Sequence, residues 1–264
     1  MNFHRNDLSI LILFLVVISL GFLSACTDSS SHANTPEEVK FLYTGDNGPG
    51  FWGDLKEEWG DCGSGIRQSP INIQEATIDQ DLTALELNLQ ATPLHLVNTG
   101  YDIREIYQEG STLKFKDISY TLLQFHYHTF SEHTISGARG VMEVHAVFKN
   151  EELGQFAVIG MLYDIGTENE FLNIFDDRLP TLEGKTVIDD TIELNAADMF
   201  TDTSSYYTYD GSLTTPPCAP IVTWIVLKEN AQLSEAQYQA FRRIMGNNFR
   251  PLQPLDGQTI WETP

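Results

Sequence analysis

The stretch Gln124-Phe125-His126-Tyr127-His128 contains two histidines separated by one residue, and a third, His145, follows in Met142-Glu143-Val144-His145. Side chains two residues apart on a β-strand point to the same face, so His126 and His128 share a face. A third imidazole from a neighbouring strand would leave one tetrahedral position for water, as in catalytic rather than structural zinc sites. The pattern therefore predicts a catalytic Zn²⁺ centre held by His126, His128 and His145.

Two polar residues occupy positions suited to orienting these histidines. Gln124 precedes His126 by two residues and Glu143 precedes His145 by two, so each shares a strand face with its histidine. A ligating imidazole usually donates its other N–H to such a group, which fixes the tautomer. Glu143 as a solvated strand residue is the alternative, but a carboxylate on an inward face would be buried without a partner.

Short β-type runs recur from Asn72 onward, separated by Gly, Asp, Asn and Ser. This spacing predicts a mainly β, single-domain protein built on a large, mostly antiparallel sheet. Gln155–Leu162 and Ile221–Leu227 are almost continuously apolar and are therefore expected at its centre. The other expected strands are 94–97, 103–107, 112–115, 120–127 and 142–148.

Two capping-box spacings predict a few peripheral helices. The first begins at Thr167 with Glu170 three residues later, and the second begins at Ser234 with Gln237. Apolar residues follow at helical intervals in both segments: Phe171 and Phe175, then Tyr238, Phe241 and Met245.

The amino terminus has the pattern of a secretory signal: Arg5, then the apolar run 8–22, then Leu23-Ser24-Ala25-Cys26. Leu-Ser-Ala-Cys resembles the lipobox of bacterial lipoproteins, so residues 1–25 are expected to be a lipoprotein-type signal peptide and Cys26 the lipidated residue. An ordinary cleaved signal with a chance cysteine is the alternative. The polar residues 26–38 are expected to be a tether, and 39–264 the folded domain. We thus expect an exported protein, periplasmic or at the cell surface, that meets the membrane only through its lipid anchor.

Composition limits the partners of the chain. Lys and Arg number 15 against 37 Asp and Glu, giving a net charge of −22. Nucleic-acid binding is disfavoured, because phosphate recognition needs a basic face. We interpret the charge as a solvated acidic surface, with a saline habitat as the alternative, and it says nothing about the reaction.

Two cysteines remain if Cys26 carries lipid. Cys62 and Cys218 form an even pair in an oxidising compartment, so a disulfide between them is expected. Cys218 follows Thr214 by four residues, and the bridge would therefore fix the loop that contains Thr214.

The histidine motifs, together with Ser131-Glu132-His133-Thr134, resemble the α-class carbonic anhydrases. The resemblance extends over most of the domain. Its other segments are Tyr43-Thr44-Gly45 to Phe51-Trp52-Gly53, Gln68-Ser69-Pro70-Ile71-Asn72-Ile73, Tyr209-Asp210-Gly211-Ser212-Leu213-Thr214-Thr215-Pro216-Pro217, Val222-Thr223-Trp224 and Asn248-Phe249-Arg250-Pro251.

The resemblance implies a fold and an activity. The fold is a twisted, largely antiparallel sheet of about ten strands, the α-carbonic-anhydrase fold, with zinc at the base of a conical cleft. The activity is the reversible hydration of carbon dioxide to bicarbonate and a proton, through attack by zinc-bound hydroxide. The chain would then be a zinc-dependent carbon–oxygen lyase, and 39–264 its catalytic domain.

Residue roles follow from the same resemblance. Thr214 would accept a hydrogen bond from the zinc-bound hydroxide and donate to ionised Glu132, and Tyr43 joins them in the catalytic group. The backbone carbonyl of Asn248 would support His128, and His133 resembles the family's buried structural histidine. Thr215 would contact bicarbonate, and an apolar wall for carbon dioxide would comprise Val147, Val158, Leu213, Val222 and Trp224.

Tyr101 departs from the family pattern. It aligns with the position where fast members carry a proton-shuttling histidine. A phenol with an unperturbed pKa of about 10 exchanges protons poorly at pH 7, so proton release is expected to limit turnover.

Two rival functions use the same scaffold: a zinc-sequestering lipoprotein and a non-catalytic zinc-binding module. Sequestration needs no orienting Thr and Glu, and non-catalytic relatives typically lack one of the three ligands, whereas all three are present here. The expected substrates are carbon dioxide and bicarbonate, and a homodimer is left open.

Overall fold

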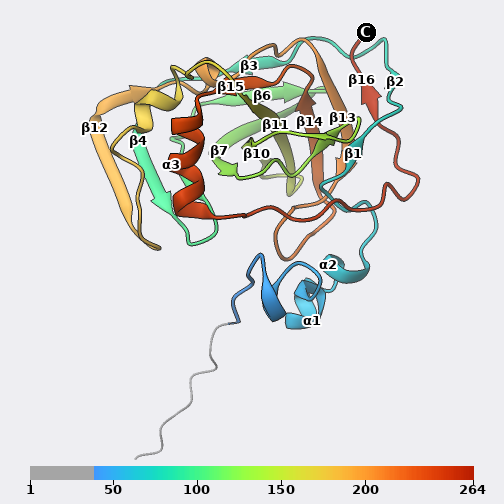
Figure 1. The fold of residues 1–264 in the computed structure, drawn as a ribbon. Coiled ribbons are helices and arrows are strands. Elements are labelled where there is room, and N and C mark those ends of the chain that lie inside the picture. Colours follow the sequence, from blue (N-terminus) through green and yellow to red (C-terminus); the bar gives the residue numbers. More distant parts are fainter. Residues whose placement is uncertain (1–38) are drawn as a thin grey trace, which may run out of the picture. The chain divides into compact units, whose positions relative to one another are not determined.

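A large mixed β-sheet dominates the computed structural model, which describes residues 39–264 (Figure 1). These residues form one compact unit. The expected signal peptide, the tether and the lipidated Cys26 lie outside the described residues. In the part of the chain that is described, no helix is long and apolar enough to span a membrane.

The strands alternate with short turns along the whole domain. In chain order they are β1 (Asn72–Ile73), β2 (Thr77–Ile78), β3 (Glu86–Asn88), β4 (Thr92–Asn98), β5 (Ile103–Ile106), β6 (Thr112–Phe115), β7 (Ile118–His128), β8 (Thr134–Ile135), β9 (Ala138–Arg139), β10 (Met142–Asn150), β11 (Gln155–Ile165), β12 (Thr186–Leu194), β13 (Tyr206–Gly211), β14 (Val222–Leu227), β15 (Ala231–Leu233) and β16 (Trp261–Glu262).

Within 39–264 the main sheet contains 13 strands, ten of them on one path in the order β12-β4-β5-β7-β10-β11-β14-β13-β16-β2. Most neighbours are antiparallel, while β11 pairs in parallel with β14 and β15, and β16 with β2. The predicted fold class is confirmed, as is the central place of the two apolar strands, β11 and β14. Among the main-sheet strands that the sequence does not predict individually, β2, β3, β15 and β16 are only two or three residues long, too short to show a period-two pattern. The other two are longer: β12 spans nine residues and β13 six.

The longest helix begins where its capping box predicts. Helix α3 (Glu235–Met245) starts after Ser234, whose hydroxyl accepts from the Gln237 N–H while the Gln237 side chain accepts from the Ser234 N–H. Its buried Phe241 packs on Tyr127, with ring centroids 4.8 Å apart. Helix α3 therefore covers one face of the sheet (Figure 1).

The helix expected from Thr167 is wrong in start and length. The segment instead forms a short 3₁₀ helix, η3 (Leu172–Phe175). The Thr167 backbone N–H and hydroxyl both donate to Oε1 of Gln232, and the Asn169 side chain accepts from the Leu172 N–H. The Thr167 backbone N–H, which a capping box would donate to the Glu170 side chain, is thus taken by a long-range contact. The remaining helices are η1 (Gly45–Asn47), α1 (Trp52–Leu55), η2 (Glu57–Trp59), α2 (Asp61–Ser64) and η4 (Ala196–Met199).

Alternation along β7 separates the hydrophobic core from the histidines. Phe125 and Tyr127 are buried in the main core cluster on the side of α3. His126 and His128 therefore project from the opposite face. On β10, Val144 and Ala146 enter the same core, and this places His145 on the face of the other two histidines.

The predicted disulfide is confirmed. Cys62 and Cys218 are joined with an S–S distance of 2.05 Å and a separation of 156 residues. Both cysteines are buried and pack with Trp52. The side-chain amide of Gln68 donates to the carbonyl of Cys218, so the bridge and this hydrogen bond together hold the loop after β13.

Replacing both cysteines by serine is expected to lower the free energy of unfolding by about 2 to 5 kcal/mol, because the unfolded chain loses a long covalent loop. Urea unfolding of wild type and C62S/C218S, each with and without reductant, measures this. Reductant should destabilise the wild type alone. Equal midpoints for all four samples would show that the bridge does not contribute.

Candidate metal centre

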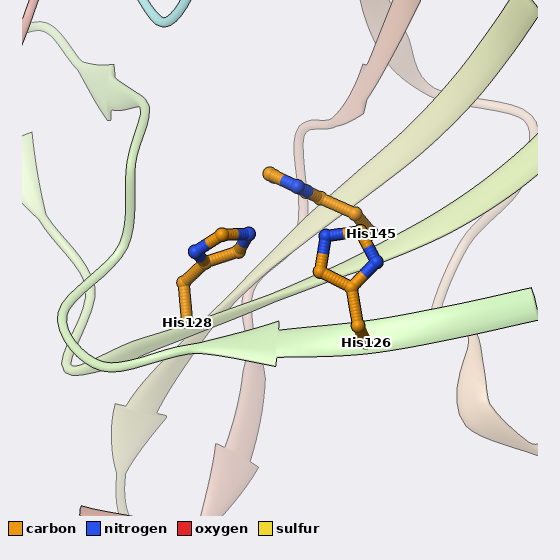
Figure 2. A group of neighbouring side chains, drawn as sticks. All are labelled: His126, His128 and His145. Atoms are coloured by element: carbon orange, nitrogen blue, oxygen red, sulfur yellow. The ribbon is translucent and has the colours of Figure 1, made fainter. Parts of the chain in front are cut away.

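Strand pairing brings the three histidines together. His145 of β10 lies directly opposite His126 of β7, and His128 follows two residues along the same strand. Figure 2 shows their rings converging. One nitrogen from each histidine lies within 4.8 Å of the nitrogens of the other two. The residues quoted first from the sequence thus form a three-nitrogen cluster.

Each histidine has one ring nitrogen held by a neighbouring group. Nδ1 of His126 lies 2.9 Å from Oε1 of Gln124, and Nδ1 of His128 lies 2.6 Å from the carbonyl oxygen of Asn248. Nε2 of His145 lies 2.9 Å from Oε1 of Glu143. Because these three oxygens accept, the protonated nitrogens face outward. Nε2 of His126, Nε2 of His128 and Nδ1 of His145 are left as lone-pair donors toward the centre.

The donor set fits zinc. Nε2 of His128 is buried and has no hydrogen-bond partner among the described residues, as expected for an atom that is reserved for a metal. Burial, followed by the nearby His128 and Arg104, lowers the pKa of His126 well below 6.5. Burial likewise lowers the pKa of His145. Neutral imidazoles are the form that binds Zn²⁺.

Glu143 links several elements of the centre. Its Oε1 accepts from His145 and lies 2.8 Å from Nδ1 of His133, while Oε2 accepts from the backbone N–H groups of Glu132 and His133. Burial would raise the pKa of Glu143, but the interactions with His133 and His145 outweigh it and lower that pKa well below its usual range. Glu143 is therefore an ionised acceptor that fixes His145.

Gly160 of β11 makes room for this carboxylate. It lies opposite His145 in the sheet, and a Cβ on it would stand 2.9 Å from Oε1 of Glu143. A side chain here would displace the group that orients His145. Sequence reasoning missed Gly160, although a glycine inside an apolar strand is itself a signal of close approach.

His133 has no ring nitrogen free for a metal. Its Nδ1 lies beside Glu143, and its Nε2 lies 2.7 Å from the hydroxyl of Tyr209. That hydroxyl in turn donates to Oγ of Ser69, at 2.9 Å. A structural role for His133 agrees with this network, although His133, Glu143 and His145 also lie close enough for a metal. The roles of Tyr209 and Ser69 had no signal in the sequence, since they are far apart in the chain.

Glu132 presents one unoccupied oxygen to the centre. Its Oε1 accepts from the backbone N–H of Arg250 at 2.7 Å. Its buried Oε2 has no hydrogen-bond partner among residues 39–264 and lies 3.6 Å from Nε2 of His128 and 3.9 Å from Nδ1 of His145. The hydrogen bond expected from Thr214 to Glu132 is therefore not made in the described residues, and it stays a prediction.

Arg250 is a buried support that sequence reasoning missed. Its guanidinium donates to the Gln68 side chain and to the carbonyl oxygens of Ser69 and Cys62. Burial lowers the pKa of Arg250 to about 10, so it is a cation at neutral pH. Through these bonds and its own backbone N–H, Arg250 connects the segment that precedes β1, and the disulfide, to Glu132 in the loop between β7 and β8.

The predicted apolar wall lies beside His145. Val158 of β11 faces Val147 of β10 on one side and Trp224 of β14 on the other, and the Trp224 ring lies 4.7 Å from the His145 ring. All five predicted wall residues belong to one apolar cluster: Val147, Val158, Leu213, Val222 and Trp224. Thr214 is buried and Thr215 half-buried in the loop between β13 and β14.

The two predicted tyrosines lie among aromatic rings of the amino-terminal segment. Tyr101 stacks on Phe41, with centroids 4.0 Å apart, and Tyr43 packs edge-on against Trp52 at 5.7 Å. Burial, followed by the charges of Glu132 and Asp102, raises the pKa of Tyr43 well above 10. The Tyr43 hydroxyl therefore keeps its proton at physiological pH.

Comparison with known proteins identifies the family. The family model described as eukaryotic-type carbonic anhydrase matches residues 47–264. A carbonic anhydrase of Nostoc sp. is 36% identical over 257 residues, covering 95% of both chains. A hyperthermostable carbonic anhydrase from a hydrothermal vent chimney has a TM-score of 0.81 at 37% identity, covering 85% of this chain and all of that one.

A further solved structure, the α-carbonic anhydrase of Thermovibrio ammonificans in complex with the inhibitor sulfanilamide, has a TM-score of 0.81 at 32% identity, with 85% of this chain and all of that chain covered. These relatives share both the fold and most of the length of the described domain. The chain belongs to the eukaryotic-type carbonic anhydrase family and is a carbonic anhydrase.

Proposed function

We propose that the chain hydrates carbon dioxide reversibly to bicarbonate and a proton, with Zn²⁺ held by His126, His128 and His145. The observation that carries the proposal is the orientation of the three imidazoles, each fixed through one nitrogen so that the other points to a common centre. When bound, zinc supplies a Lewis acid that makes water a nucleophile near neutral pH, as is already known for carbonic anhydrases.

The orienting groups are Thr214 and Glu132. Oε2 of Glu132 is a buried acceptor without a partner among the described residues, and the Arg250 backbone N–H holds the other oxygen, Oε1, in place. The Thr214 hydroxyl would donate a hydrogen bond to Oε2 of Glu132. The lone pairs of the Thr214 oxygen would then be left to accept a hydrogen bond from the attacking nucleophile. Thr215 would contact the bicarbonate product. Tyr43, whose hydroxyl stays protonated, would take part only as a hydrogen-bonding group.

Carbon dioxide would bind against the apolar wall. The molecule is too weakly polar to be held by hydrogen bonds, so shape and dispersion must position it. Val158, Val222 and Trp224 are buried, which supports a dry surface beside His145. The arrangement would keep water away from the carbon until attack.

Metal removal tests the proposal. The purified chain should hydrate carbon dioxide, lose that activity after treatment with a chelator, and regain it when stoichiometric zinc is added back. A protein that sequesters zinc would bind the metal equally well but show no hydration in any of the three states. Hydration that is unchanged in metal-free protein would contradict the site.

Transfer of the product proton from the metal centre to the solvent is expected to limit turnover. Tyr101 stacks on Phe41, and a phenol transfers protons poorly at pH 7. Tyr101→His should raise kcat severalfold at low buffer concentration, where transfer out of the site limits the rate, and leave kcat at high buffer nearly unchanged. Stopped-flow hydration over a buffer series measures the difference. No gain at low buffer would show that another group already carries the proton.

We further propose that the protein is exported and anchored by lipid at Cys26. The confirmed disulfide supports an oxidising compartment, and Leu23-Ser24-Ala25-Cys26 supports lipidation. A homodimer stays a prediction.

A further inference from the structure

Arg104 projects from the same face of the sheet as the metal-binding histidines. It lies on β5 directly opposite His126 of β7, and directly opposite residues on paired antiparallel strands point the same way. It is therefore a neighbour of a candidate zinc ligand, one strand further from the centre.

A buried carboxylate holds the guanidinium in place. Nη2 of Arg104 donates to Oδ2 of Asp102 at 2.7 Å, and the side chains are 35% and 7% exposed respectively. The other carboxylate oxygen, Oδ1, accepts from the Thr99 hydroxyl at 2.8 Å. Because Asp102 is itself fixed, Arg104 is fixed in one orientation.

One donor of Arg104 is left without a partner. Its Nε is buried and makes no hydrogen bond among the described residues. A buried N–H on a cation is costly to leave unpaired, so the atom requires an acceptor from outside residues 39–264. Guanidinium N–H groups match the oxygens of planar oxyanions better than any other side chain does.

The net negative charge of the protein opposes the approach of anions to the centre. With a net charge of −22, the surface as a whole repels anions, whereas carbon dioxide is neutral. A fixed cation on this chain, close to the centre and in addition to the proposed Zn²⁺, would therefore favour binding of an anionic product for the reverse reaction.

We propose that Arg104 forms an oxyanion-binding position on the wall of the candidate centre, where its Nε–H donates to bicarbonate. This inference rests on the proposed carbon dioxide hydration. Arg104 makes and breaks no covalent bond. It raises the affinity for bicarbonate in the dehydration direction and for small oxyanions that compete with it, and Asp102 acts as its positioning residue.

The kinetic test uses the zinc-loaded full chain. For Arg104→Gln, KM for bicarbonate in dehydration should rise about tenfold, the cost of losing one charge-assisted hydrogen bond, with kcat changed less than threefold. Arg104→Lys keeps the positive charge but lacks the guanidinium Nε, so its KM should lie between that of the wild type and that of Arg104→Gln. The matched control is Arg243→Gln, which removes an exposed arginine on α3 and should leave KM unchanged. An unchanged KM for Arg104→Gln would overturn the proposal.

A second readout does not depend on turnover. In zinc-loaded wild-type protein, bicarbonate should shift the ¹⁵N–¹H NMR signal of Arg104 Nε saturably, while the Arg243 signal stays in place. If the signal does not move while the wild type hydrates carbon dioxide, the Arg104 proposal fails alone. If the wild type does not hydrate carbon dioxide, the proposed function fails, and the NMR titration still decides whether Arg104 binds the anion.

Discussion

His126→Ala is expected to abolish carbon dioxide hydration and to weaken zinc binding strongly. The substitution removes one of three nitrogens that converge within 4.8 Å and leaves a two-histidine site on this sheet face. Loss of a group that only supports a ligand already costs about 10- to 100-fold in metal affinity or activity. Loss of a ligand should cost more, so activity should fall by at least about 100-fold and the protein should be isolated with little zinc.

Metal analysis, together with hydration assays at saturating zinc, separates binding from catalysis. The matched control is His95→Ala, because His95 is half-buried on β4 and lies outside the converging triad. The control should retain full activity and one zinc per chain. Hydration at the wild-type rate by His126→Ala would contradict the whole assignment of the centre.

The sequence predicts the centre well because period-two alternation is a local rule. On β7 the rule sends Phe125 and Tyr127 into the core and the two histidines to the other side. It also gives Gln124 and Glu143 the correct faces, and the structure places both at 2.9 Å from their histidines.

The groups that the sequence does not reveal act across long separations. Tyr209 reaches His133, and Arg250 reaches Glu132 and the Cys62 carbonyl, only because the sheet and the carboxy-terminal segment fold over one another. The failed helix at Thr167 has the same cause, since Gln232 takes its donors. No local pattern encodes contacts of this kind.

The alternation that points Arg104 toward the centre also places Glu105 in the core. Glu105 is fully buried, and both its carboxylate oxygens accept from the backbone N–H of His95, at 2.8 and 3.0 Å. It makes no ion pair within 39–264. Burial raises the pKa of Glu105 from 4.5 to about 8, and the His95 hydrogen bond offsets only part of this.

A raised folded-state pKa makes stability depend on pH in a defined direction. Below pH 4.5 Glu105 is protonated in both the folded and the unfolded state, so its titration does not lower the free energy of unfolding. Between pH 4.5 and about 8 folding must take up a proton, so stability falls by about 1.4 kcal/mol per pH unit. Above the folded pKa the penalty is constant.

Glu105→Gln removes the titration but keeps an oxygen for the His95 N–H. The buried amide adds a constant cost, so the quantity to compare is the pH dependence. The free energy of unfolding of the variant minus that of the wild type should grow by about 4 kcal/mol between pH 5 and pH 8. Urea unfolding of zinc-loaded protein measures it, with the exposed Glu109→Gln as control, for which the difference should stay constant. The other titrating groups are common to both proteins, so their contributions to the pH dependence cancel in this difference. Parallel curves of unfolding free energy against pH would contradict the prediction, because they would mean that Glu105 is already ionised in the folded core.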